Sequence, residues 1–104
     1  MKQNLLKIIN NYGINNQLKY IHSEYFELTE AIINHEWLES ERGLKGTYFI
    51  AEEIADVMVM LKQFQYYYGI EDSEIEKIMK SKIDRQLRRI EEENNAIEER
   101  DTRE

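Results

Sequence analysis

No proline interrupts this chain of 104 residues, and only four glycines occur in it. Proline in a helix interior costs about 3 kcal/mol and glycine about 1 kcal/mol relative to alanine, so their scarcity removes the usual barriers to long helices. The rest of the chain is rich in Glu, Lys, Leu and Ile, a composition typical of helical proteins. A chain of this length supports one hydrophobic core. We therefore expect an all-α domain.

Apolar residues recur at helical spacing in four segments of the chain. The clearest segment covers residues 14–37, where the apolar side chains three or four positions apart are Leu18, Ile21, Tyr25, Leu28 and Ile32. This spacing predicts a helix that buries one stripe. Related patterns predict helices over residues 2–11, 47–68 and from 73 to about 90. Together they predict an antiparallel bundle of about four helices.

Glycines and polar residues mark the ends of these helices. Gly13 follows the first helix and suits a left-handed C-terminal position, and Gly69 ends the third. Residues 38–47 contain the other two glycines and little periodic apolar content, which predicts a connecting loop. Ser73, with Glu76 three residues later, forms a capping-box pattern at the start of the fourth helix.

The C-terminal segment is almost wholly polar. We expect a helical domain over residues 1–90, followed at 91–104 by a charged helical extension or a disordered tail. The third predicted helix differs, because it is apolar over much of its circumference. Such a helix lies at the centre of a fold or in a subunit interface.

Charge and cysteine content exclude several functions. The net charge of −7 disfavours binding to duplex nucleic acid, which depends on neutralising phosphates with Lys and Arg. The absence of cysteine excludes disulfides and thiolate metal sites. The N-terminus lacks the apolar run of a signal peptide, and no stretch approaches membrane-spanning length. We expect a cytoplasmic protein that does not bind membranes.

Two acid pairs are the main candidate site. Glu24 and Glu27 lie three residues apart in the second predicted helix, and Glu53 and Asp56 lie three apart in the third. Each pair therefore shares one helix face, beside the apolar stripe in the second helix and pointing toward buried surface in the third. Four carboxylates on two facing helices would repel one another strongly without a cation. We interpret them as one metal site.

The ligand types indicate which metal this site would take. Oxygen-only carboxylate sites suit Mg²⁺, or Mn²⁺ in its place, whereas zinc and copper favour His or Cys. A ferritin-like di-iron site would need Glu-x-x-His pairs, and Lys19 and Ile32 stand where those glutamates would precede His22 and His35. Taken singly, either acid pair also fits a plain solvated helix face.

A basic ridge of Lys82, Arg85 and Arg89 runs along the fourth predicted helix. This spacing places the three side chains along one border of the apolar stripe. The ridge has two interpretations, a phosphate-binding surface or a set of exposed charges that balances the acidic surroundings.

These residues together resemble the MazG-like all-α nucleoside triphosphate pyrophosphohydrolases, particularly the short single-domain members of phages and Gram-positive bacteria. The resemblance spans roughly residues 16 to 90. It is carried by Gln17-Leu18-Lys19, Glu24-x-x-Glu27-Leu28, Glu52-Glu53-Ile54-Ala55-Asp56-Val57 and Lys82-x-x-Arg85-Gln86-Leu87-x-Arg89-Ile90. Many relatives carry an acid directly before the first motif glutamate, where this chain has Ser23.

The resemblance implies Mg²⁺-dependent hydrolysis of a nucleoside triphosphate between the α and β phosphates, giving the monophosphate and pyrophosphate. The catalytic metal ligands it implies are Glu24, Glu27, Glu53 and Asp56. Lys82 and Arg85, with Arg89 beside them, would hold phosphate oxygens, and Trp37 and His35 near the loop are candidate contacts to the base. The resemblance also implies a homo-oligomer, either a dimer or a tetramer.

Two other functions are compatible with the sequence. One is a non-catalytic helical module whose acidic surface binds a partner protein, which Mg²⁺ binding would distinguish from an enzyme. The other is a MazG-like protein that binds nucleotides with little hydrolysis, an alternative that Ser23 keeps open. The nucleobase and the sugar are not specified by these motifs.

Overall fold

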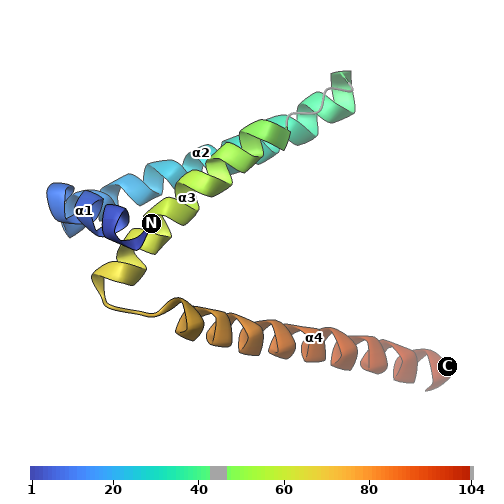
Figure 1. Ribbon diagram of the computed structural model, residues 1–104. Coiled ribbons are helices and arrows are strands. Elements are labelled where there is room, and N and C mark those ends of the chain that lie inside the picture. Colours follow the sequence, from blue (N-terminus) through green and yellow to red (C-terminus); the bar gives the residue numbers. More distant parts are fainter. Residues whose placement is uncertain (43–46, 104) are drawn as a thin grey trace. The chain divides into compact units, whose positions relative to one another are not determined.

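The computed structural model describes residues 1–42 and 47–103, with side chains for residues 1–37 and 47–101. Four helices account for nearly all of these residues (Figure 1). They are α1 (Lys2–Tyr12), α2 (Ile14–Arg42), α3 (Thr47–Tyr67) and α4 (Asp72–Arg103). The described residues contain no strand. The all-α prediction is therefore confirmed.

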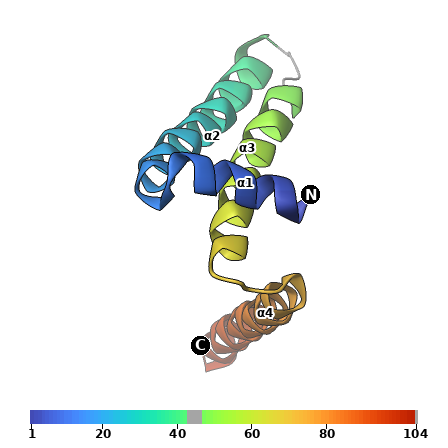
Figure 2. The same ribbon diagram turned by 60° about the vertical axis from the view of Figure 1, so that its left-hand side comes forward.

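The chain forms two compact units, Met1–Gly69 and Ile70–Glu104. In the first unit, α2 and α3 run antiparallel side by side, and α1 packs against both (Figures 1 and 2). The apolar helix α3 is thus the central element of this unit, one of the two positions that its sequence predicted.

Glycines with positive φ follow two of these helices. Gly13 has φ 88° and donates its N–H to the Ile9 carbonyl at 2.8 Å, which closes the end of α1. Gly69 has φ 69° and donates its N–H to the Tyr66 carbonyl. Side chains other than glycine rarely adopt such angles. The predicted ends of the first and third helices are therefore confirmed.

The core of the first unit is small and partly polar. Among the side chains that the structure describes, its buried apolar residues are Leu5, Ile9, Met60 and Tyr66. Beside them lie the buried amides Gln17, Gln63 and Gln65. The Lys2 ammonium lies 5.6 Å from the centre of the Tyr66 ring, a cation–π geometry that adds to the packing of α1 against α3. The Lys62 ammonium lies 5.6 Å from the centre of the same ring, and this contact is within α3.

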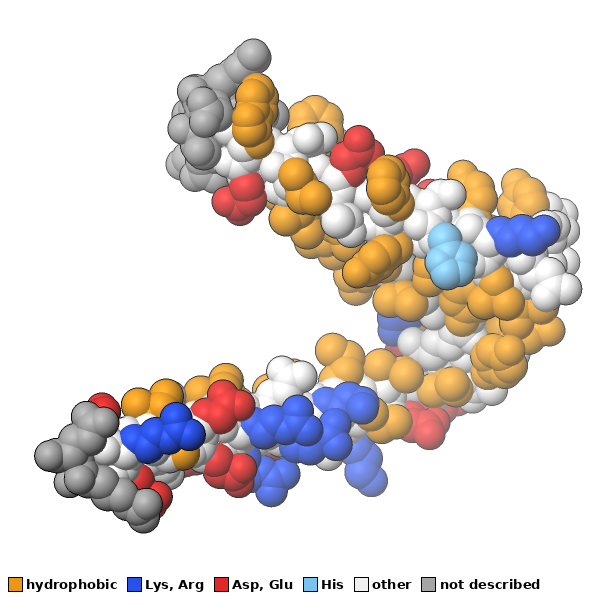
Figure 3. Space-filling view, turned by 180° about the vertical axis from the view of Figure 1, so that it is seen from behind, with side chains coloured by type: hydrophobic (Ala, Val, Ile, Leu, Met, Phe, Trp, Pro, Cys, Tyr) orange, Lys and Arg blue, Asp and Glu red, His pale blue; other side chains and the backbone are white. Residues whose placement is uncertain are grey.

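The predicted buried stripe of α2 is not buried within a single chain. Leu18, Tyr25 and Ile32 are exposed, and Ile21 and Leu28 are half-buried. The prediction of burial was wrong for the single chain because, among the described residues of this unit, α2 packs against α1 and α3 alone, and these two helices cover part of its circumference. Figure 3 shows many hydrophobic side chains on the surface. The α2 stripe therefore has apolar area that remains uncovered.

Two predicted boundaries need correction. The loop predicted at residues 38–47 is shorter, because α2 continues to Arg42 and α3 begins at Thr47, while residues 43–46 lie outside the described residues. Leu, Glu and Arg in this stretch are good helix formers, and their propensity extends the helix without apolar periodicity. At the other boundary, α4 begins at Asp72, and the Glu71 carbonyl accepts the N–H groups of Glu74 and Ile75. Ser73 thus lies within the first turn rather than at the predicted cap.

The second unit contains α4, which continues without a break through residue 90 to Arg103. The domain limit at residue 90 stays a prediction. The apolar stripe of α4 is exposed at Met79, Ile83, Leu87 and Ile90. None of the helices in the described part of the chain combines the length and apolar content needed to cross a membrane.

Candidate metal centre

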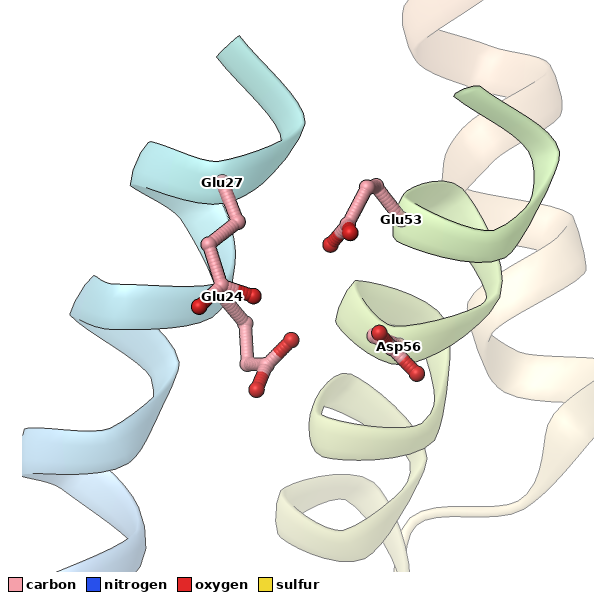
Figure 4. Close-up of side chains that lie close together, drawn as sticks. All are labelled: Glu24, Glu27, Glu53 and Asp56. Atoms are coloured by element: carbon pink, nitrogen blue, oxygen red, sulfur yellow. The ribbon is translucent and has the colours of Figure 1, made fainter. Parts of the chain in front are cut away.

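The two acid pairs meet on the facing sides of α2 and α3 (Figure 4). Glu24 and Glu27 are one turn apart on α2, and Glu53 and Asp56 are one turn apart on α3. One carboxylate oxygen from each of the four residues lies within 4.8 Å of the corresponding oxygen of every other. The four acids therefore form one cluster, which we call the acid cluster.

Burial divides the acid cluster into an inner and an outer pair. Glu24 and Glu53 are half-buried, and the Oε2 atom of each is fully covered without a hydrogen-bond partner among the described residues. Glu27 and Asp56 are exposed. The prediction that both α3 acids point toward buried surface is therefore correct for Glu53 and wrong for Asp56. Asp56 has a shorter side chain, and its position on α3 leaves it at the solvent edge.

The inner carboxyls are electrostatically unfavourable as anions. The pKa of Glu24 is raised above its ordinary value, first by burial and then by the charges of Glu27, Asp56 and Glu53. The pKa of Glu53 is also raised, by burial first and then by the charges of Glu27, Asp56 and Glu52. A bound cation would offset both causes of the raised pKa values, which are burial and the neighbouring negative charges. The cluster therefore gains more from a cation than an exposed pair of acids would.

The donor set and its spacing fit a hard divalent cation. Oxygens on opposite sides of Mg²⁺ or Ca²⁺ lie about 4 to 5 Å apart, which is twice the metal–oxygen distance. The four cluster oxygens lie no more than 4.8 Å from one another, and all are carboxylate oxygens. A covered carboxylate oxygen without a donor is costly, and coordination to a cation would satisfy it. Glu24 and Glu53 would thus be the inner ligands, and Glu27 and Asp56 the outer ones.

Cavities adjoin the acid cluster on two sides. The larger, of about 700 Å³, lies among α1, α2 and α3 and includes Glu24 and Asp56 in its wall. The smaller, of about 380 Å³, includes Glu27 and Glu53. A ligand in either cavity would contact two of the four acids.

Only one of the two residues predicted to contact the base, His35 and Trp37, lines a cavity beside the acid cluster. His35 is half-buried and lines the smaller cavity, together with Phe49. Trp37 is exposed and lines neither of the two cavities beside the acid cluster. Among the two, His35 is the residue that the fold brings next to the cluster.

The predicted phosphate-binding residues belong to the second unit. Lys82, Arg85 and Arg89 are exposed on α4. Lysine and arginine side chains gather on this unit, where Lys77, Lys80 and Arg88 add to the basic surface (Figure 3). The phosphate-binding role of the three residues stays a prediction.

Sequence reasoning missed the residues that build the larger cavity. Gln17 and Gln63 are buried in its wall, where Gln17 Nε2 donates a 2.8 Å hydrogen bond to Gln63 Oε1. Tyr12, Asn16 and Tyr20 also line it. One available signal was Gln63, an amide that lies on α3 three residues after Met60 and three before Tyr66. A polar side chain at such a position usually has a buried partner.

Comparisons with protein-family models, with curated proteins and with solved structures give no significant match to this chain. The resemblance to the MazG-like enzymes rests on the motif residues named above.

Proposed function

We propose that this chain is a Mg²⁺-dependent nucleoside triphosphate pyrophosphohydrolase of the MazG-like kind. The observation that carries the proposal is the convergence of Glu24, Glu27, Glu53 and Asp56, with covered and unpartnered Oε2 atoms on the two inner glutamates. Such a cluster is suited to a cation and, through it, to a phosphorylated ligand in a protein whose own charge is negative.

Within this proposal, the four acids hold the cation between α2 and α3. When bound, Mg²⁺ would neutralise the triphosphate and lower the pKa of water for attack at phosphorus. The exposed pair, Glu27 and Asp56, faces the solvent from which substrate and water arrive. One of the four carboxylates would also accept the proton of the attacking water. Water adds to phosphorus as the bond between the α and β phosphates breaks, which yields the monophosphate and pyrophosphate.

The functional form in this proposal is a homo-oligomer, either a dimer or a tetramer. The first unit buries few apolar side chains, whereas Phe26, Ile33, Tyr48 and Phe49 are each more than half exposed. Exposed apolar area of this extent is typical of surfaces that bind a partner. A second copy of the chain would cover the uncovered side of the α2–α3 pair. Lys82, Arg85 and Arg89 would bind phosphate oxygens in the assembled protein.

Pyrophosphate release tests the catalytic proposal. We expect the wild-type protein to release pyrophosphate from one or more canonical or modified (d)NTPs in the presence of Mg²⁺, and Glu53→Gln to lose most of this activity. Glu36→Gln is the matched control, because Glu36 is an exposed glutamate of α2 outside the acid cluster. Absence of release with every substrate, or equal release by wild type and Glu53→Gln, would reject the proposal.

Two alternatives have support in specific features. The exposed apolar side chains of α2 and α3 favour a non-catalytic interaction module, which would be indifferent to Mg²⁺. Ser23, which lines the larger cavity where many relatives have an acid, favours a protein that binds nucleotides with little hydrolysis. Mg²⁺-dependent nucleotide binding without pyrophosphate release would select the second alternative.

A further inference from the structure

The larger cavity beside the acid cluster has the location of a ligand site. It lies within the first unit, and Glu24 and Asp56 are shared between its wall and the cluster. Its volume of about 700 Å³ falls in the range of small-molecule sites. A molecule seated in it would therefore contact whatever is bound by these two acids.

The wall of this cavity includes buried hydrogen-bonding groups with fixed orientation. Gln63 is 2% exposed and Gln17 is 6% exposed, and both line the cavity. Their mutual hydrogen bond uses one amide hydrogen of Gln17, and Gln63 Nε2 also lies 3.7 Å from the sulfur of Met60. An amide has two donor hydrogens and a carbonyl acceptor, so each residue has further hydrogen-bonding capacity. Held in this way, the amides can read the polar edge of a flat heterocycle.

Aromatic and apolar groups supply the remaining wall. The aromatic residues Tyr12 and Tyr20 line the cavity from α1 and α2, and the apolar residues Ile8 and Val59 line it from α1 and α3. Stacking on aromatic side chains is a general way to bind a nucleobase. Asn16 adds a polar group at the same wall, where its Nδ2 donates to the Tyr12 carbonyl.

The smaller cavity is less suited to a neutral heterocycle. Its wall contains three glutamates, Glu27, Glu30 and Glu53, in about 380 Å³. No buried amide lines it among the described residues.

We infer that the larger cavity binds the nucleoside part of the substrate, with the phosphates directed to the acid cluster. This inference rests on the proposed function and deepens it. Gln17 and Gln63 contact the base edge, Tyr12 and Tyr20 pack against the ring, and Asn16 lies within reach of a polar group of the nucleoside. These five residues thereby set the specificity for the base, and Trp37 takes no part in it.

Calorimetry with two probes separates this inference from the metal site. Non-hydrolysable α,β-imido deoxynucleoside triphosphates report on the whole site, and inorganic tripolyphosphate reports on the phosphate and metal region, both with Mg²⁺. Because Tyr20 is exposed, Tyr20→Ala should fold normally. We expect Tyr20→Ala to lower the affinity for the best-bound nucleotide analogue by roughly tenfold and to leave the affinity for tripolyphosphate unchanged. Asn16→Ala should show the same selectivity.

Control variants show whether a change in affinity is specific to the residues of the cavity. Tyr25→Ala removes an equally exposed tyrosine of α2 that lies outside the cavity, and it should change neither affinity. Glu53→Gln should lower the affinities for both probes. The inference is overturned if Tyr20→Ala and Asn16→Ala leave the affinity for the analogue unchanged, or if they lower the affinities for both probes equally. It is also overturned if Trp37→Ala is the only one of these variants that lowers the affinity for the analogue. In those cases the proposed function stands. If neither probe binds the wild-type protein, the proposed function fails and this inference fails with it.

Discussion

Gln17 Nε2 on α2 donates a 2.8 Å hydrogen bond to Gln63 Oε1 on α3, and both side chains are buried. The bond joins the two helices that carry the acid cluster, in the wall of the adjoining cavity. It therefore connects the stability of the first unit with the geometry of the candidate site.

Removing one partner of this pair should destabilise the protein. Gln63→Leu leaves the buried amide of Gln17 without its acceptor, and we expect the free energy of unfolding to fall by about 1 to 3 kcal/mol. The double variant Gln17→Leu/Gln63→Leu should recover part of this loss, because no buried amide is left unpaired. Urea unfolding of wild type, both single variants and the double variant measures the coupling. Additive losses would show that the bond contributes no coupling energy.

The acid cluster should make the metal-free protein less stable as pH rises. The pKa values of Glu24 and Glu53 in the folded protein are raised above the ordinary value of 4.5, so the folded state binds protons more tightly than the unfolded state. Their contribution to stability is therefore fully present below pH 4.5 and is lost as pH rises through the raised pKa values. Relative to wild type, Glu53→Gln should gain stability between pH 4 and pH 7 in EDTA. Thermal unfolding checks this, and a pH-independent difference between the two proteins would contradict it.

A divalent cation should stabilise the folded protein at neutral pH. At a Mg²⁺ concentration one hundred times the dissociation constant, binding adds about 2.7 kcal/mol to the free energy of unfolding. We expect the midpoint of thermal unfolding to rise with Mg²⁺ for wild type and for Glu36→Gln, and to rise much less for Glu53→Gln. An equal response of Glu53→Gln would place the cation elsewhere.

Assembly should depend on an apolar face of α2. This face includes Phe26, Ile33 and Trp37, which lie along one side of the helix and are exposed in the single chain. We expect the wild-type protein to be an oligomer in light scattering and Ile33→Glu to shift it toward the monomer, because an unpaired charge is costly in an apolar interface. Asn10→Glu, at an exposed position of α1, adds the same charge and should leave the assembly intact. A monomeric wild type would reject the oligomer proposal.

Phosphate binding by the basic ridge can be tested separately. If Arg85 binds a phosphate oxygen, Arg85→Ala should raise KM by roughly 10- to 100-fold, the effect of losing a charged hydrogen bond of about 1.5 to 3 kcal/mol. Arg88→Ala is the control, since Arg88 is an exposed arginine of the same helix outside the ridge. An unchanged KM for Arg85→Ala would leave the ridge as a set of exposed charges.

Most of the secondary structure was predictable because its causes are local. The spacing of Leu18, Ile21 and Tyr25 identified α2, and Gly13 and Gly69 marked helix ends that the φ angles confirm. The errors lay at positions where two local signals compete. Residues 38–42 combine helix-forming residues with no apolar periodicity, and Ser73 offers a cap one residue inside the helix that begins at Asp72.

The acid cluster was predictable in its members and not in its internal asymmetry. Spacing of three residues fixes Glu24 with Glu27 on one face, and Glu53 with Asp56 on another, whatever surrounds them. Which oxygens are covered depends on how α2 and α3 pack against each other, and that packing leaves Asp56 exposed and one oxygen of Glu53 covered.

The sequence by itself thus determined that the chain is helical, where its helices lie and which acids share a helix face, because these properties follow from backbone propensity and from the helical repeat. Only the tertiary structure decided that Gln17 meets Gln63, that two of the acids are half-buried, and that a cavity of about 700 Å³ adjoins them. Burial, pairing and cavities arise between residues far apart in the chain, and the relative placement of α1, α2 and α3 sets them.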